Sequence, residues 1–167
     1  MTLDYLQIVN QLEMLPHPEG GYYKEEYRSK DIIPNAALPQ FSGDRNFCTS
    51  IYFLLTSENF SGFHRIKQDE IWHFYSGSPL AVHVIDEEGI YTKHIIGMDI
   101  LDGKYPQLTV PANCWFASSV VNENDYSFVG CTVAPGFDFD DFELAKKEEL
   151  SAIYPQHKSI IEKLTRI

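Results

Sequence analysis

Residues 60–85 read FSGFHRIKQDEIWHFYSGSPLAVHVI, and this stretch decides the fold of the chain. After Glu70 come Ile, Trp, His, Phe, Tyr and Ser, a composition typical of strands rather than helices. Successive side chains of a strand point to opposite faces, so Glu70, Trp72 and Phe74 share one face. His64 ends the preceding apolar segment, and a short turn brings it back beside Glu70. Two groups that can transfer protons or bind a metal therefore meet at one wall.

The spacing of these residues resembles the first motif of the cupins, G-x5-H-x-H-x3/4-E-x6-G, which is a signature of small β-barrels. His64, Glu70 and Gly77 match the motif in register. Ile66 stands where the motif has its second His, and Gly62 lies too close to His64 to be the opening Gly. The resemblance therefore covers the first His, the Glu and the closing Gly.

The second cupin motif, G-x5-P-x-G-x2-H-x3-N, has its best match in residues 110–120, VPANCWFASSV. Pro111 matches the motif, Asn113 replaces its second Gly, Phe116 replaces its His and Val120 replaces its final Asn. Asn tolerates a left-handed backbone better than most residues, so the turn survives the change. The metal-binding His of this motif is absent.

Of the four positions that usually hold the cupin metal, only His64 and Glu70 keep a ligand. Two protein ligands alone rarely hold a first-row metal well. We therefore expect no cofactor and no stoichiometric transition metal. The alternative is a divalent metal bound by His64, Glu70 and further ligands from outside the motifs.

Two further stretches extend the resemblance over nearly the whole chain, LPHPEGGYYKEEYRS at 15–29 and APGFDFDDFELA at 134–145. Together with the central run they resemble a family of short, single-domain cupins of unknown function found in bacteria and fungi. The resemblance implies a jelly-roll barrel that is commonly homodimeric and is related in fold to the dTDP-sugar epimerases. It implies no settled reaction.

The remaining pattern predicts an all-β fold with an N-terminal helix and C-terminal helices, and the resemblance implies that the strands form a cupin-type double-stranded β-helix. A chain of 167 residues fits one domain, here residues 1–167. Apolar side chains at helical spacing predict a helix over 3–14 with Thr2 as its N-cap. Two more helices are predicted over 141–152 and 156–165, the acidic residues of 138–143 complementing the helix dipole. Further strands are predicted over residues 21–28, 46–56, 79–85, 90–96, 107–110, 114–121 and 126–133.

Charge and composition exclude several classes of partner. The net charge is −11 and the isoelectric point is about 4.8, whereas binding to nucleic acid or an anionic membrane requires clustered Lys and Arg. No apolar stretch approaches the ~20 residues of a membrane helix, and the first residues lack a basic signal-peptide start. Cys48, Cys114 and Cys131 show no CxxC spacing and indicate reduced thiols in a cytoplasmic protein.

The histidines and Glu70 leave alternatives open. His17 lies in a Pro-rich loop that would cover the barrel mouth of this subunit or of a partner. His73 has the parity of an outer-face residue, and His83 alternates with valines as a solvated strand residue would. Glu70 is either a ligand or acid in a semi-apolar pocket, where desolvation raises a carboxyl pKa, or a structural group paired with an Arg such as Arg65 or Arg28.

Three hypotheses for function follow. The first is a metal-independent isomerase or epimerase acting on a carbohydrate-like or other small polar molecule, with His64 as general base and Glu70 or Tyr52 as acid or orienting group. Residues 60–64 are similar to the segment that carries the base His in dTDP-4-keto-sugar epimerases. The second is a metal-dependent cupin enzyme that uses His64 and Glu70. The third is a non-catalytic binding module, in which aromatic rings stack on the ligand. The candidate ligand-binding rings are Trp72, Phe74 and Phe116.

Overall fold

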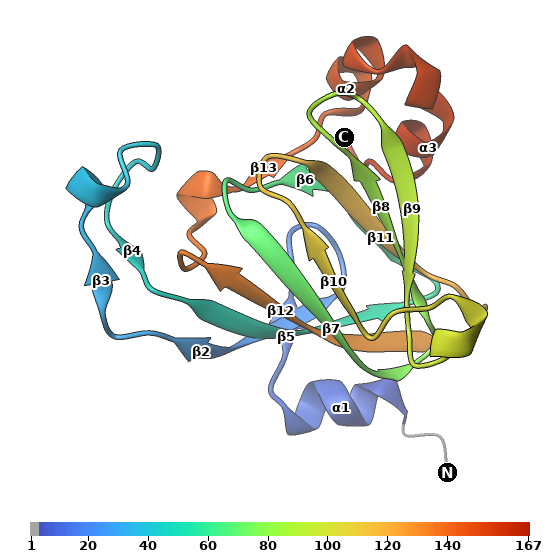
Figure 1. Ribbon diagram of the computed structural model, residues 1–167. Helices are drawn as coiled ribbons and strands as arrows, with labels where there is room; N and C mark the ends of the chain where they lie inside the picture. Colours follow the sequence, from blue (N-terminus) through green and yellow to red (C-terminus); the bar gives the residue numbers. More distant parts are fainter. Residues whose placement is uncertain (1–3) are drawn as a thin grey trace.

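Two β-sheets lie face to face in the computed structural model, which describes residues 4–167 (Figure 1). The larger sheet has six strands in the order β1 (Leu15–Pro16), β2 (Tyr22–Arg28), β5 (Thr49–Thr56), β12 (Tyr126–Ala134), β7 (Asp69–Gly77) and β10 (Gln107–Val110). The other has five strands in the order β13 (Glu143–Leu144), β6 (Phe60–Arg65), β11 (Trp115–Val120), β8 (Leu80–Ile85) and β9 (Tyr91–Ile96). The chain crosses repeatedly between the sheets from β5 onward, which confirms the predicted jelly roll.

The space between the two sheets holds the main hydrophobic core. Trp72 on β7 packs against Phe53 on β5 and Phe116 on β11, with ring centroids 6.0 and 6.2 Å apart. All three side chains are no more than 1% exposed. Because Phe116 and Trp72 belong to opposite sheets, their contact holds the two layers together.

The N-terminal helix is shorter than predicted. Helix α1 covers Tyr5–Gln11, and the Asp4 side chain caps it by accepting a hydrogen bond from the Leu6 N–H at 3.1 Å. Thr2, the predicted cap, lies outside the described residues. The apolar side of α1 packs with Leu54, Met14 and Tyr126 on the outer face of the six-stranded sheet.

The predicted helix over 141–152 is wrong in its first residues. Residues Phe139–Asp141 form a short 3-10 helix, η3, after which β13 pairs with β6, and helix α2 begins only at Lys147 (Lys147–Ile153). Asp141 is buried and accepts two hydrogen bonds from Arg45 at 2.8 Å, so this acid does not serve a helix N-terminus. A further 3-10 helix, η4 (Pro155–His157), leads into α3 (Lys158–Lys163).

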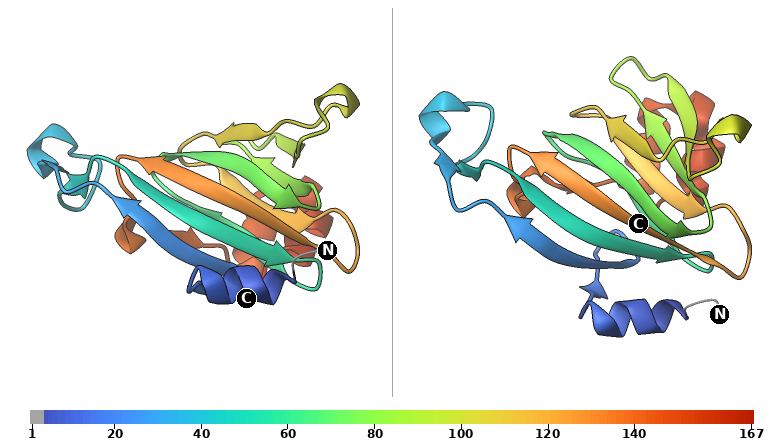
Figure 2. Two further views of the ribbon diagram at one scale, coloured as in Figure 1. Left: turned by 90° about the horizontal axis from the view of Figure 1, so that it is seen from below. Right: turned by 60° about the horizontal axis from the view of Figure 1, so that its bottom comes forward.

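The segment before β5 carries short regular elements. Strand β3 (Ile32–Ile33) pairs with β4 (Arg45–Asn46), and the 3-10 helix η1 (Asn35–Ala37) lies between them. Both views of Figure 2 show this arm extending away from the two sheets. A last 3-10 helix, η2 (Ile100–Asp102), precedes β10. No helix within residues 4–167 has the length and apolar character needed to span a bilayer.

Candidate functional site

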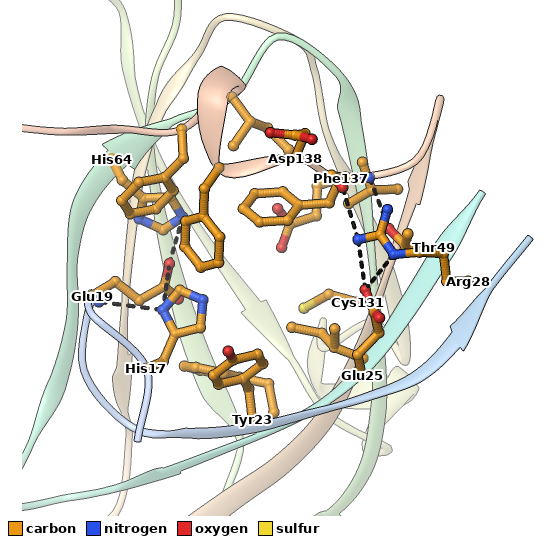
Figure 3. Close-up of a pocket in the computed structure, with 17 residues that line it drawn as sticks. His17, Glu19, Tyr23, Glu25, Arg28, Thr49, His64, Cys131, Phe137 and Asp138 are labelled. Carbon is orange, nitrogen blue, oxygen red and sulfur yellow. Dashed lines mark hydrogen bonds and ion pairs between the residues drawn. The ribbon is translucent and has the colours of Figure 1, made fainter. Parts of the chain in front are cut away.

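A cavity of about 350 Å³ opens between the sheets, on the inner face of the six-stranded sheet (Figure 3). Its walls come from β2, β5, β7 and β12 of that sheet, from His64 on β6, from the loop that carries His17 and from residues 137–142. This size falls at the small end of pockets for organic ligands, which span ~300–1,000 Å³. The cavity is therefore the candidate functional site.

A buried ion pair closes one side of the cavity. His64 Nε2 lies 3.0 Å from Glu19 Oε2, while His64 Nδ1 lies 2.7 Å from the carbonyl oxygen of Gly62. Ser61 donates its hydroxyl hydrogen to Glu19 Oε1 at 2.8 Å. Since both ring nitrogens of His64 face oxygen acceptors, the ring is placed to carry both protons as an imidazolium.

The pKa values of the two partners agree with this assignment. Burial by itself raises the pKa of Glu19, but the charge of His64 and the hydrogen bonds from His64 and Ser61 outweigh burial, so the pKa is lowered to about 2. Burial lowers the pKa of His64, but the charge and the hydrogen bond of Glu19 outweigh burial, so the pKa is raised. The pair is ionised at neutral pH.

His17 is held in the opposite protonation state. Its Nδ1 accepts a hydrogen bond from the Glu19 backbone N–H at 3.2 Å, so the neutral ring carries its proton on Nε2. Burial lowers the pKa of His17, and the nearby charge of Glu19 only partly opposes this effect. Figure 3 shows the second ring nitrogen facing the cavity, where its N–H can donate to a ligand.

Glu70 is the cavity group that titrates near neutral pH. Its side chain comes from β7, and the residue is 9% exposed. Burial raises its pKa to about 7, against the opposing charge of His64, and Glu19 adds to the rise. The thiol of Cys131 on β12 is its hydrogen-bond partner, and burial keeps the pKa of that thiol well above its usual value. Cys131 therefore stays protonated and donates to Glu70.

On the opposite side of the cavity, the guanidinium of Arg28 is already paired with a carboxylate. Arg28 on β2 contacts Glu25 Oε1 from Nη2 at 2.7 Å and from Nε at 3.0 Å. The same guanidinium donates to the carbonyl oxygen of Phe137 at 2.9 Å and to Asn46 Oδ1 at 2.8 Å. Arg28 thus fastens the strand β2 to the segment after β12.

Residues of the C-terminal segment hold the loop that supplies Glu19. Arg166 donates from Nε to the Glu19 carbonyl oxygen at 3.2 Å, and its guanidinium lies over the Phe60 ring, 4.2 Å from the centroid. Gly20 has a φ of +114°, and a Cβ there would collide with the Phe60 carbonyl oxygen. The loop can press against β6 only because this position is glycine.

The structure places His64 and Glu70 at the same cavity, as the first motif predicts. The three predicted ligand-binding rings are not at this cavity. Trp72 and Phe116 are each 1% exposed and do not line the cavity, and Phe74 packs against the same core. The Phe116 ring lies 4.1 Å from the His64 ring and supports it from behind. None of the three predicted ligand-binding rings therefore lines the cavity, and two of them, Trp72 and Phe116, are enclosed between the sheets.

Tyr52, which the sequence analysis placed beside His64 as an acid or orienting group, does not line the cavity either. Its neighbours Ile51 and Phe53 line the cavity, so alternation directs Tyr52 to the outer face of the sheet. There it packs against Phe128 and Tyr75, with ring centroids 5.6 and 6.2 Å away. Tyr52 therefore does not share the cavity with His64.

Neither Arg65 nor Arg28 pairs with Glu70, as one alternative proposed, and His83 is not solvated. Arg65 pairs with Glu143 at 2.7 Å rather than with Glu70, just as Arg28 pairs with Glu25. His83 is buried rather than solvated, and its ring nitrogens lie 2.8 Å from Tyr91 Oη and 3.1 Å from Ser119 Oγ. Burial lowers the pKa of His83 to about 4. The outer-face His73 does form a hydrogen bond, to Thr132 at 3.1 Å.

Sequence reasoning missed Glu19. The residue lies in the Pro- and Gly-rich segment HPEGG, and its partner His64 is far along the chain. A carboxylate between Pro18 and Gly20 was the available signal, since such a loop folds over the adjacent sheet. His17 lines the cavity of its own subunit, one of the two placements that its Pro-rich loop allows.

The cavity does not fit a cupin metal. Ile66 lines the wall at the position of the second His, and the ring of Phe116 fills the position of the last ligand. The remaining His64 already uses both ring nitrogens, on Gly62 and Glu19. Within the described part of the chain, no three His, Cys, Asp or Glu side chains are grouped to hold a metal ion.

Comparison with known proteins identifies close relatives in sequence and structure. The profile of a family described as Cupin superfamily (DUF985) matches residues 6–145. Protein SO0799 from Shewanella oneidensis, a solved structure, is 41% identical with a TM-score of 0.87 over 96% of each chain. A hypothetical protein from Leishmania major is 37% identical with a TM-score of 0.87, covering 97% of this chain and 98% of that one. The uncharacterized protein YML079W of Saccharomyces cerevisiae is 28% identical over 153 residues, 86% of this chain and 76% of the yeast protein.

More distant structures share the fold alone. Oxalate decarboxylase from Bacillus subtilis is 16% identical with a TM-score of 0.54, and the match covers 89% of this chain and 36% of the decarboxylase. At this identity the likeness extends to the arrangement of strands and not to the reaction.

Proposed function

Since the chain belongs to the cupin family DUF985, we propose that it binds a small organic molecule between its sheets and moves a proton on that molecule without a metal, as an isomerase or epimerase does. One observation carries this proposal. Glu70 lines a cavity of about 350 Å³ and has a pKa of about 7, the value at which a carboxyl group can both accept and return a proton at neutral pH.

Glu70 is the proposed general base and acid. Its carboxylate takes a proton from a carbon next to a substrate carbonyl, and the O–H formed on Glu70 then returns that proton to a neighbouring carbon on the same face. The substrate keeps its composition, as an isomerisation requires. The N–H at Nε2 of His17 is suited to donate a hydrogen bond to the carbonyl oxygen, where negative charge develops.

His64 has a different role from the base that sequence reasoning assigned to it. A general base needs a free lone pair, and both nitrogens of His64 are already engaged by Gly62 and Glu19. We assign His64 to positioning: its imidazolium charge favours the ionised form of Glu70, and its ion pair fixes the loop that carries His17. A non-catalytic binding module would need the same cavity but no titrating Glu70.

Deuterium exchange tests the reaction class. Wild-type protein in D2O is incubated with a panel of small α-hydroxy and α-amino aldehydes and ketones, and NMR follows the loss of C–H signals. Exchange of at least one panel member by wild type, and its loss in Glu70→Gln, is the expected result. Glu26→Gln, at an exposed position of β2, is the matched control and should keep wild-type exchange. Equal exchange rates in wild type and Glu70→Gln would refute the role of Glu70.

A homodimer in the cytoplasm completes the proposed function. The aromatic strand β2 carries Tyr27, which is 53% exposed, and a short edge strand β1 is all that protects this side of the sheet. Edges of this kind are commonly protected by pairing between subunits. The three cysteines are free thiols, which suits a reducing compartment.

A further inference from the structure

We propose that the cavity takes an organic cation, a small molecule that carries an ammonium group, in preference to an anionic ligand such as a sugar nucleotide. The inference rests on the binding site of the function proposed above and adds the charge of the ligand. It follows from the charges that line the cavity and from the arrangement of three phenylalanine rings beside them.

The charged groups of the cavity leave an excess of negative charge. The lining includes four carboxylates, on Glu19, Glu25, Glu70 and Asp138. Glu19 is paired with His64, and Glu25 is paired with Arg28. Glu70 and Asp138 form no ion pair among residues 4–167, although the charge of His64 acts on Glu70 and that of Arg45 acts on Asp138. An anion entering this space would meet more carboxylates than cations, whereas an ammonium group would be attracted to the carboxylates.

Arg28 is not free to receive an anion. Its guanidinium donates four hydrogen bonds, two to Glu25 and one each to Phe137 and Asn46. A single N–H on Nη1 remains, so a bidentate contact to a phosphate or carboxylate would require Arg28 to leave Glu25 behind as a further unpaired negative charge. Recognition of a diphosphate needs free Arg or Lys side chains or a helix N-terminus, and the cavity offers none of these from the described residues.

Three aromatic rings form one wall of the cavity next to Asp138. The rings of Phe137 and Phe139 have centroids 5.0 Å apart at an interplanar angle of 80°. Phe142 makes angles of 74° with the first and 73° with the second. The rings are therefore packed edge to face against one another. Phe139 is also 50% exposed, so a cation in the cavity can lie against the face of this ring, the geometry of cation–π binding.

The volume of the cavity also limits the size of the ligand. A cavity of about 350 Å³ accommodates a small amine or quaternary ammonium compound, and a sugar nucleotide exceeds what this small pocket would enclose. Phe139 is 50% exposed and lies at the entrance, so a cation would pass its ring on the way in. Glu70 at the inner wall then lies within reach of atoms bonded to the cationic group.

Calorimetry with isosteric probes tests the charge preference directly. The full chain is titrated at pH 8, where Glu70 is ionised, with choline and with its neutral isostere 3,3-dimethylbutan-1-ol. Benzylamine and benzyl alcohol form a second pair, and 3,3-dimethylbutanoate is the anionic probe. At least one cation should bind ten times more tightly than its neutral partner, and the anion should bind least. Failure of both cations to exceed their neutral partners, including no binding at millimolar concentration, overturns the proposal.

Variants locate the effect. Asp138→Asn removes a charge but keeps an oxygen that can cap η3, where Asp138 accepts from the Asp140 N–H at 2.9 Å. It should weaken binding of the cation several-fold and leave the neutral probe unchanged. Asp140→Asn makes the same chemical change at an exposed neighbour outside the cavity and should alter neither. Equal effects of the two variants would show that the preference comes from overall charge, against the proposal.

Different results would refute the proposed proton transfer by Glu70 and the proposed preference for a cation. Binding of these probes requires no proton transfer, so loss of deuterium exchange in Glu70→Gln together with a preference for the anion refutes the cation site alone. A clear preference for cations with unchanged exchange in Glu70→Gln refutes the proton transfer alone.

Discussion

His64 on β6 and Glu19 in the loop before β2 form an ion pair, with 3.0 Å between Nε2 and Oε2 and both side chains less than 10% exposed. The pair joins the five-stranded sheet to the segment that leads into the six-stranded sheet. Burying a charged side chain costs free energy, because the charge loses its contact with water. Two charged side chains remain ionised in the interior only when each is paired with the other. The interior of this cupin therefore depends on a contact that neither cupin motif contains.

Removing the charge of Glu19 should destabilise the protein. Glu19→Gln leaves the buried imidazolium of His64 without its carboxylate, and breaking a buried pair typically costs ~3–5 kcal/mol. Urea denaturation at pH 7 measures the free energy of unfolding. Glu26→Gln, the same change on the exposed side of β2, should have an effect within about 0.5 kcal/mol. Similar losses in both variants would contradict an ionised pair.

Replacing Glu70 should have the opposite effect on stability, in a pH-dependent way. The folded-state pKa of about 7 exceeds the ordinary value of 4.5, so the folded protein holds a proton that the unfolded chain has lost between these pH values. Its contribution to stability therefore falls as pH rises from 4.5 to 7. Glu70→Gln does not titrate and should be more stable than wild type by ~1–3 kcal/mol at pH 8, but not at pH 4.5. Urea denaturation of both proteins at pH 4.5 and pH 8 measures this difference in the free energy of unfolding. The same difference at both pH values would contradict the raised pKa of Glu70.

Purified protein should carry no stoichiometric transition metal. The reason is the composition of the wall, in which Ile66 and Phe116 replace two ligands and His64 has no free nitrogen. Elemental analysis after expression in metal-supplemented medium is the measurement. One equivalent of metal that disappears in His64→Ala would show that His64 leaves Glu19 to bind it.

Light scattering at low micromolar concentration should detect a homodimer. The expectation rests on the exposed apolar side chains along β2 and its surroundings, among them Tyr27, Ile32 and Phe47. A single species with the 19.2 kDa mass of one chain would refute it.

Much of the fold follows from local patterns. The sequence predicts strands over 79–85 and 90–96, and the structure places β8 and β9 there as an antiparallel pair, from Leu80 with Ile96 to Ile85 with Tyr91. Strand alternation also placed Glu70 and Trp72 correctly on the inner face. It could not tell that Glu70 lines the cavity while Trp72, two residues further along β7, is enclosed in the core.

The site was less predictable because its partners are distant in sequence. Periodicity gives no information about whether the inner face of residues 46–56 is that of Tyr52 or of Phe53; the packing of α1 against Leu54 decides it. The acidic residues after β12 looked alike, yet Asp141 is buried against Arg45 and Asp138 lines the cavity. Those assignments depend on tertiary contacts, which no local pattern records.

The contact between Arg166 and the carbonyl oxygen of Glu19 joins residues 147 positions apart. A growing polypeptide emerges from the ribosome with the Glu19 loop first, and the guanidinium that holds this loop is synthesised only after all the strands around the cavity. During synthesis the protein therefore passes through a stage in which the strands of the jelly roll are available but the loop bearing His17 and Glu19 is not yet held in place by Arg166. The wall of the cavity that this loop forms is completed after the strands.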